Sequence, residues 1–187
     1  MIEKSFTLVP FEKNDVFSLN GKFKVTKNVL NCDLNISPNK RAIGSVDSKI
    51  STADRRLSSI YVPNDPENLR FTKKEGLWDS TCFEIFIKSG NHYIEWNFAP
   101  SGEWWVMDFS DYRKRIGSVE VGTLIPHKME WAHREGLECH VSIPVKKEKF
   151  EIGISCVLEV GATKTHWALA HPKDKLDFHD STCFQTI

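Results

Sequence analysis

Leu77-Trp-Asp-Ser-Thr-Cys-Phe-Glu-Ile-Phe-Ile87 is the stretch of sequence that decides the fold. In its second half the apolar residues Phe83, Ile85 and Ile87 alternate with residues that include Glu84. A two-residue period of this kind is typical of a β-strand with one face in the core. Together with the residues that follow it, the stretch predicts three consecutive strands over residues 80–88, 92–98 and 103–109.

The same alternation recurs along the chain, whereas no segment keeps the 3.6-residue period of an amphipathic helix. Further strands are predicted over residues 6–11, 29–36, 137–143, 150–160 and 165–171. About ten short strands at this spacing are typical of an all-β sandwich. Because no linker or repeat interrupts the pattern, we expect residues 1–187 to form a single domain. That domain is predicted to be a two-sheet antiparallel β-sandwich of the jelly-roll or immunoglobulin-like kind, with residues 45–76 left without a predicted structure.

Composition excludes several classes of partner. The 187 residues include 25 basic and 25 acidic side chains, so the chain lacks the basic excess that binds nucleic acid or an anionic membrane. Residues 1–10 lack the apolar core of a signal peptide, and no apolar run is long enough for a transmembrane helix. Five cysteines without close pairs indicate reduced thiols, which predicts a cytoplasmic protein.

The first hairpin determines how two glutamates are placed. Ser89-Gly90 suits a two-residue loop, and counting back from it places Glu84 opposite Glu95 and Cys82 opposite Asn97. Two carboxylates that face each other repel unless a cation or a proton lies between them. The sequence offers Arg113, Arg70 or a lysine for this role, and a bound Ca²⁺ would also serve.

The second turn, Ala99-Pro-Ser-Gly102, determines the face of the third strand. A loop of two or four residues places Trp104 beside the two glutamates, whereas an odd-length loop or a bulge would reverse the faces. Trp78, six residues before Glu84, has the same parity as that residue. An even loop therefore predicts a single face that collects Trp78, Glu84, Glu95, Asn97 and Trp104.

Aromatic rings beside carboxylates and an amide have the chemistry of sugar recognition. The rings cover the apolar C–H face of a pyranose, and the polar groups accept its hydroxyl protons. The alternative is that residues 45–76 simply cover this face.

Several motifs, in their order and spacing, resemble the DOMON-like proteins of the type 9 carbohydrate-binding-module group. The opening Leu8-Val-Pro-Phe11 also fits the first strand of that group, and the resemblance covers nearly the whole chain. The motifs are Gly76-Leu-Trp-Asp-Ser-Thr-Cys-Phe-Glu-Ile-Phe-Ile87, Tyr93-Ile-Glu-Trp-Asn-Phe-Ala-Pro-Ser-Gly-Glu-Trp104, Phe109-Ser-Asp-Tyr-Arg113, and His166-Trp-Ala-Leu-Ala-His-Pro172 with Asp177-Phe-His179.

The resemblance implies a β-sandwich with a ligand site on a sheet face or at its edge. In sugar-binding members two Trp rings enclose a terminal sugar, and Trp78 and Trp167 are the residues that match here. Some members hold Ca²⁺ and other DOMON domains bind haem. The chain departs from secreted members because it lacks a secretion signal and a hydrolase domain, and its C-terminal motifs resemble an intracellular branch. The predicted ligand-binding residues are Trp78, Glu84, Glu95, Asn97, Trp104, Arg113, Trp167 and His171.

No cofactor is predicted. His171, Asp177 and His179 do not have a standard zinc spacing, and we expect the histidines to anchor the C-terminal tail by hydrogen bonds. Haem would need an axial pair, and Met107 on the predicted core face does not converge with His92.

The sequence therefore predicts a non-catalytic domain that binds a small sugar-like ligand. One alternative is a glycoside hydrolase, because directly opposed Cβ atoms about 4.5–5.5 Å apart are compatible with the paired carboxylates of retaining enzymes. No Gly-x-Ser-x-Gly motif occurs, and Cys82 has no placed base. The other alternative is a structural or protein-interaction domain without a small ligand.

Overall fold

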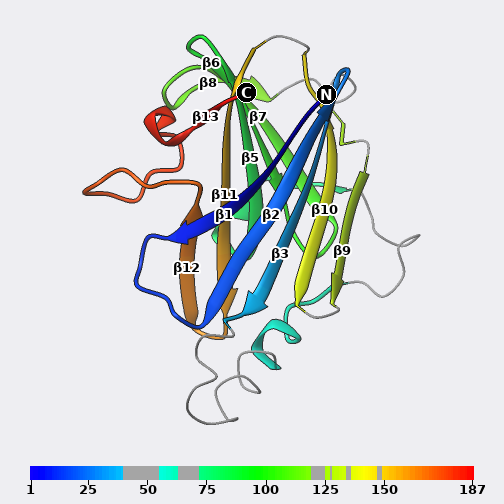
Figure 1. Cartoon of the computed structure of the whole chain (residues 1–187), viewed down its shortest axis with the longest axis vertical. Helices are drawn as coiled ribbons and strands as arrows, with labels where there is room; N and C mark the ends of the chain where they lie inside the picture. The colour runs from blue at the N-terminus through cyan, green and yellow to red at the C-terminus, as the bar shows by residue number, and fades with distance from the viewer. Residues whose placement is uncertain (40–54, 63–71, 119–124, 127, 134–135, 147–148) are drawn as a thin grey trace.

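The computed structural model describes residues 1–39, 55–62, 72–118, 125–126, 128–133, 136–146 and 149–187 (Figure 1). The described chain is nearly all β-structure, with two short 3₁₀ helices and a helical segment at residues 55–57. None of the described helices is long and apolar enough to cross a membrane. The elements are β1 (Ile2–Pro10), β2 (Phe17–Thr26), β3 (Val29–Pro38), β4 (Thr72–Lys73), η3 (Leu77–Asp79), β5 (Cys82–Ser89), β6 (His92–Phe98), β7 (Glu103–Asp111), β8 (Lys114–Ser118), β9 (Lys128–His133), β10 (Leu137–Pro144), β11 (Glu151–Val160), β12 (Thr163–Ala168), η4 (Ser181–Cys183) and β13 (Gln185–Thr186).

The strands join edge to edge into one continuous sheet. Its order is β4-β7-β6-β5-β11-β12-β1-β2-β3-β10-β9, with β8 added to β7 and β13 to β11. Residues 2–8 of β1 pair with β2, and its last two residues pair with β12, so this strand links the two halves of the sheet. The pairings are antiparallel except for β4 with β7. The prediction of an all-β chain is confirmed, but the sheet is a single curled one and a sandwich of two separate sheets is not found.

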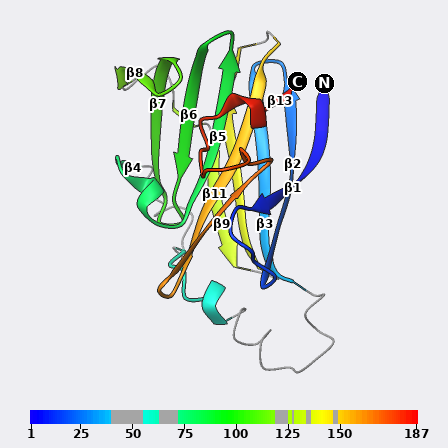
Figure 2. The ribbon, with the colours of Figure 1, turned by 90° about the vertical axis from the view of Figure 1, so that its left-hand side faces the viewer.

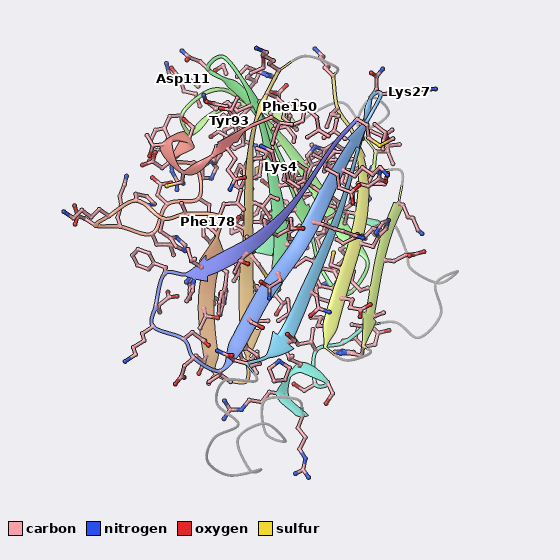
Figure 3. The ribbon with its side chains drawn as sticks, viewed as in Figure 1. Lys4, Lys27, Tyr93, Asp111, Phe150 and Phe178 are labelled. Carbon is pink, nitrogen blue, oxygen red and sulfur yellow. The ribbon has the colours of Figure 1, made fainter. Side chains whose placement is uncertain are left out.

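The curl encloses the core between the two halves (Figure 2). Phe83, Trp96 and Phe98 from one half are at most 1% exposed, and they share a cluster with Leu19 and Leu34 from the other. The side chains fill the space between the strands, with Phe150 near the start of β11 (Figure 3). Truncating one buried aromatic residue of this kind costs about 3–5 kcal/mol, so the core orders the strands that carry the site.

A glycine in β11 makes room for the C-terminal segment on the outer face. A Cβ atom at Gly153 would lie 2.4 Å from Cε1 of Phe184, a separation that real contacts do not reach. The Phe184 ring also packs on Phe86 of β5, with 5.6 Å between the ring centroids. Residues 171–184, which we name the C-terminal strap, therefore cross β5 and β11 on the face turned away from the core (Figure 2).

All five cysteines are free thiols, as the sequence predicted. Four of them are buried, and burial raises the pKa of the Cys82 thiol well above its ordinary value. A buried thiol of raised pKa is a poor nucleophile, because the thiolate is the reactive form.

Candidate functional site

The two glutamates share the outer face of the sheet, but they lie diagonally and not directly opposite. Glu84 pairs with Asn97, and Glu95 pairs with Phe86. The loop is Gly90-Asn91, one residue later than predicted, because a glycine of positive φ at the first central position suits a type II′ turn, and Gly90 has φ 61°. A shift of two in the pairing keeps every side chain on its predicted face, so Glu84, Glu95 and Asn97 remain together.

The prediction that Trp104 joins this face is wrong. Residues 100–102 form a three-residue loop, in which Gly102 has φ 90° and its N–H donates to the carbonyl oxygen of Ala99 at 3.0 Å. A turn followed by a left-handed glycine is the usual three-residue hairpin loop, and its odd length reverses the faces of β7. Trp104 therefore packs in the core against Trp96, and the outer face receives Trp105, Met107 and Phe109 instead.

The prediction that Trp167 forms a second aromatic wall is also wrong. Cys156 pairs with Phe83 on one side and with Trp167 on the other, which places the indole on the core face. Trp167 is 2% exposed, and its Nε1–H donates to Oγ1 of Thr165 at 2.9 Å. The neighbouring His166 is on the outer face.

A cavity of about 470 Å³ lies on this outer face, and it brings together four of the predicted residues. Asn97 lies beneath it, fully buried, and donates from Nδ2 to Oε1 of Glu95 at 2.8 Å. His171 lies outside it, packed against Phe11, with its Nε2 2.9 Å from the carbonyl oxygen of Val9. The predicted residues in the wall are Trp78, Glu84, Glu95 and Arg113, and they are joined there by Met107, Phe109, Arg115, Val157, His166, Leu176, Asp177, Phe178 and His179.

The two buried carboxyl groups have raised pKa values. Each residue is 3% exposed. Burial, and then repulsion from Glu95, raise the pKa of Glu84 to about 8, against a hydrogen bond of 2.8 Å from Ser155 Oγ to Glu84 Oε2. Burial also raises the pKa of Glu95 to about 7, although the bond from Asn97 and the charges of Arg113 and Arg115 oppose this rise. The pair therefore retains a proton near neutral pH, as clustered carboxyl groups at functional sites do.

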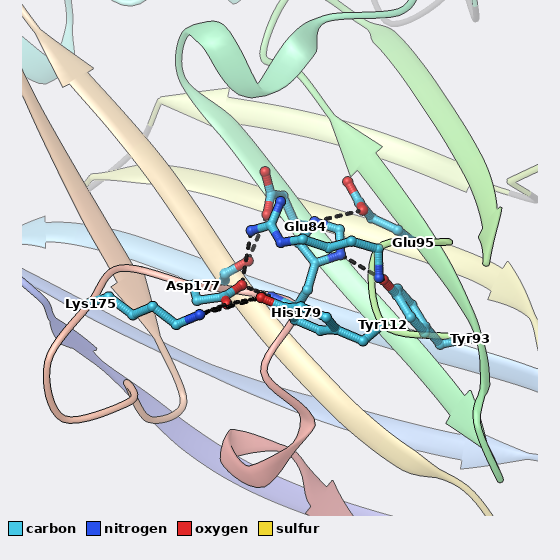
Figure 4. A network of polar contacts seen from close by, with 9 residues as sticks. Glu84, Tyr93, Glu95, Tyr112, Lys175, Asp177 and His179 are labelled. Atoms are coloured by element: carbon cyan, nitrogen blue, oxygen red, sulfur yellow. Dashed lines mark hydrogen bonds and ion pairs between the residues drawn. The ribbon is translucent and has the colours of Figure 1, made fainter. Parts of the chain in front are cut away.

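Asp177 holds the C-terminal strap over the pocket (Figure 4). Its carboxylate accepts hydrogen bonds from Tyr112 Oη at 2.5 Å and from Arg113 Nη2 at 2.9 Å, and Lys175 Nζ lies 3.0 Å away. Burial alone would raise the pKa of Asp177, but these partners lower it well below its ordinary value. The aspartate is 4% exposed and ionised, so it ties the strap to the loop between β7 and β8.

His179 of the strap reaches the glutamate pair. Its Nδ1 lies 2.8 Å from Tyr93 Oη, and its ring lies edge-on to Phe86, Tyr93 and Phe109. Its Nε2 lies 3.6 Å from Oε2 of Glu95. Burial lowers the pKa of His179 to about 4, so the imidazole is neutral at physiological pH. The expected anchoring of the tail by histidines is thus found for His179, whereas the anchoring by Asp177 was not predicted.

Among the described residues, the C-terminal strap is the segment that covers this face. The described residues 59–61 line a separate cavity beside the loop at residues 99–101. Arg70 and most of residues 45–76 lie outside the described residues. Among the described residues, no group of three or more potential metal ligands clusters together, at the glutamate pair or elsewhere.

Sequence reasoning missed several residues that line the cavity or contact its wall. Tyr93 and Phe109 were within reach, because an odd second loop brings Phe109 to the same face as Tyr93. Ser155 carried a weaker signal as the polar residue in the middle of the long apolar strand β11. No local sequence pattern predicts that Leu176 and Phe178 line the cavity, because their position depends on how the strap folds back over the sheet.

The assembled site offers an indole, two phenyl rings, two proton-sharing carboxyl groups and two arginines around one cavity. No protein-family model matches the sequence, and no curated protein matches it. A crystal structure at 2.70 Å resolution of a proposed carbohydrate-binding protein from Bacteroides uniformis ATCC 8492 is similar in fold, with a TM-score of 0.64 over 98% of this chain and 84% of that one. The two sequences are 10% identical, so the likeness establishes a shared fold.

Proposed function

We propose that this chain is a non-catalytic, DOMON-like domain that binds a small sugar-like ligand in the cavity beneath the C-terminal strap. The observation that carries the proposal is the pair of buried glutamates, Glu84 and Glu95, in a cavity that also exposes the ring of Trp78. Burying two carboxyl groups costs stability, and carboxyl groups of raised pKa cluster at functional sites. Their place in a cavity therefore supports a binding role. The fold shared with a proposed carbohydrate-binding protein agrees with this reading.

The cavity wall has aromatic side chains that can stack on a sugar ring and polar side chains that can form hydrogen bonds with its hydroxyl groups. Trp78 on η3 supplies an aromatic face for the C–H groups of a pyranose ring. The carboxyl groups of Glu84 and Glu95 accept hydrogen bonds from sugar hydroxyls, and the Arg113 guanidinium donates hydrogen bonds to sugar oxygens. Each hydrogen bond to a charged group contributes about 1.5–3 kcal/mol when it is well formed. A monosaccharide or a sugar terminus therefore fits a cavity of about 470 Å³.

Replacing Trp78 with alanine tests this role. We expect the variant to bind its best sugar at least about tenfold more weakly, because it loses the stacking surface while keeping both glutamates. Isothermal titration calorimetry against a panel of monosaccharides and sugar phosphates measures the change without depending on tryptophan fluorescence.

Trp105→Phe is the matched control for that experiment. Trp105 lies on the same face and is also half-buried, yet it packs outside the cavity, with Lys73 Nζ 4.9 Å from its ring centre. This variant should bind as the parent protein does. If Trp78→Ala leaves every measured affinity unchanged while Trp105→Phe behaves normally, the site is wrongly placed.

A glycoside hydrolase remains the second candidate, because two neighbouring carboxyl groups of raised pKa can supply the acid and the base of such a reaction. The diagonal placement of Glu84 and Glu95 weakens it, since the directly opposed geometry expected for a retaining enzyme is absent. We therefore expect no release of nitrophenol from a panel of nitrophenyl glycosides between pH 4 and pH 9. Turnover that Glu84→Gln abolishes would establish the hydrolase in place of the binding domain.

A further inference from the structure

The basic side chains around the cavity are already engaged by other carboxylates. Arg113 Nη2 lies 2.9 Å from Asp177, and Arg115 Nη1 lies 2.6 Å from Glu75. Among the described basic side chains, His179 alone lies within ion-pair distance of Glu84 or Glu95, and its imidazole is neutral. The two buried glutamates thus share a site without a cation of their own, which is a costly arrangement in a folded protein.

One oxygen of the pair has no partner. Ser155 donates to Oε2 of Glu84, and Asn97 donates to Oε1 of Glu95. Within the described part of the chain, the buried Oε2 of Glu95 has no hydrogen-bond partner. It lies on the side of His179, which with Glu95 forms part of the cavity wall, and Figure 4 shows Glu84 and Glu95 on neighbouring strands above the strap. The residue that carries this unpaired acceptor therefore lines the cavity, with the acceptor itself next to His179.

We propose that the ligand is an amino sugar, whose protonated amine lies against Glu84 and Glu95 and donates to Oε2 of Glu95 while its ring stacks on Trp78. This inference rests on the proposed function and narrows it to one class of sugar. An ammonium group has three hydrogen-bond donors and one positive charge. It can therefore donate to Oε2 of Glu95 and also neutralise the charge of the two carboxyl groups. Aromatic faces also attract cations, and Trp78 is the type of ring that does so best.

Protonation of the site gives the proposal a second signature. The empty pair keeps protons near neutral pH, because burial and mutual repulsion raise its pKa values. A bound cation lowers the pKa of nearby carboxyl groups, so an amino sugar releases protons when it binds and a neutral sugar does not. The other titratable and charged groups in the cavity wall are Asp177, Arg113, Arg115, His166 and His179. Further such groups contact these wall residues or the buried Asn97, namely Tyr93, Tyr112, Lys175, Glu12, Glu75 and Cys82.

Calorimetry of the full chain at pH 6 tests the inference. The probes are glucosamine, galactosamine and mannosamine, their N-acetyl counterparts, the parent sugars, and ethanolamine as an amine without a ring. We expect at least one amino sugar to bind about tenfold or more tightly than its N-acetyl and parent forms, since its bonds to the carboxylates are charge-assisted. Repeating the titration in two buffers of different ionisation enthalpy should show proton release for the amino sugar alone.

Glu95→Gln provides the discriminating variant. It keeps the shape of the side chain and the bond from Asn97 but removes the negative charge. We therefore expect the amino sugar to lose its preference over the parent sugar, so that the ratio of the two affinities falls to about one. Glu130→Gln is the matched control, because Glu130 lies on the distant strand β9 and pairs with Lys128 at 3.0 Å. Thermal unfolding of both variants verifies that they are folded.

The outcomes separate the inference from the proposed function. If parent and N-acetyl sugars bind as tightly as the amino sugars, the inference is overturned and sugar binding stands. If ethanolamine binds as tightly as any amino sugar, the ring contributes nothing and the inference is again overturned. If no sugar of any kind binds, both the proposed function and the inference fail.

Discussion

Replacing Glu84 with glutamine will stabilise the protein above pH 8 and leave it almost unchanged below pH 4.5. The reason is that burial and the neighbouring Glu95 raise the pKa of Glu84 from 4.5 to about 8. A carboxyl group whose pKa is raised by folding favours the folded state while it is protonated. Its stabilising effect is complete at pH values below the pKa of the unfolded state, and it is lost as the pH rises through the pKa of the folded state.

The wild-type protein therefore loses stability between about pH 5 and pH 9, and Glu84→Gln removes much of that loss. One pKa unit corresponds to about 1.4 kcal/mol, so the full rise from 4.5 to about 8 corresponds to about 5 kcal/mol. Because part of this rise is shared with the neighbouring Glu95, we expect a gain at pH 9 on the order of 2–4 kcal/mol. For a domain of this size, that raises the melting temperature by roughly 5–10 °C. Thermal unfolding followed by circular dichroism from pH 4 to pH 9 measures the difference between the two curves.

Glu130→Gln serves as the control here as well, because the Glu130 side chain is 50% exposed and lies on the other half of the sheet. Its curve should run parallel to that of the parent protein. Parallel curves for Glu84→Gln and the parent would mean that folding does not raise the pKa of Glu84. The conclusion that Glu84 and Glu95 keep a proton near neutral pH would then be wrong. A stabilising mutation at a buried carboxyl group is expected where that group is kept for binding.

Replacing Asp177 with alanine will release the C-terminal strap. The aspartate joins the strap to Tyr112 and Arg113, and it also accepts a hydrogen bond of 3.1 Å from the backbone N–H of His179. Removing a buried, paired carboxylate costs up to about 3–5 kcal/mol, and because Arg113 and Lys175 are more than half exposed we expect about 2–4 kcal/mol. The pKa of Asp177 is lowered, so this stabilisation is present above the unfolded value of 3.8 and is lost as the pH falls below it.

Hydrogen–deuterium exchange followed by mass spectrometry measures the release directly. At pH 7 peptides that cover residues 171–184 should exchange faster in Asp177→Ala, while peptides from β2 and β3 keep their protection. Asp174→Ala is the matched control, because Asp174 is exposed and lies three residues earlier in the same strap. Unchanged exchange in Asp177→Ala would show that the packing of Phe184 on Gly153 holds the strap without the ion pairs.

Side-chain alternation within strands was enough to predict the all-β fold and part of the site. It placed Glu84, Glu95 and Asn97 on one face, even though the first hairpin loop lies one residue later than expected. That success has a simple cause, since a shift of two residues in a strand pairing leaves the faces unchanged. Trp78 and Arg113 also reached the cavity as expected, one from the turn before β5 and the other from the turn after β7.

The same rule explains where prediction failed. The loop at residues 100–102 has an odd length, and whether a Pro-Ser-Gly turn closes with two, three or four residues depends on the φ of Gly102, which sequence alone does not fix. Trp167 was placed by resemblance, and its true face follows from the pairing of β12 with β11. The strap contributes Asp177, Phe178 and His179 through contacts with residues far away in sequence, which no local pattern encodes.

The first strand also constrains when the molecule can assemble. Val9 pairs with Ala168, so the junction between the two halves of the sheet cannot form until residue 168 has left the ribosome. Synthesis adds about 5–20 residues per second, so many seconds pass between the synthesis of β1 and that of β12. During this time β1 can pair with β2 alone, and its last two residues, Val9 and Pro10, have no partner strand. Contacts between such distant residues form slowly, because the intervening chain must be ordered first. The hairpin of β1 and β2 is therefore an early, local structure, and closure at Val9 is the late event that commits the chain to its final shape.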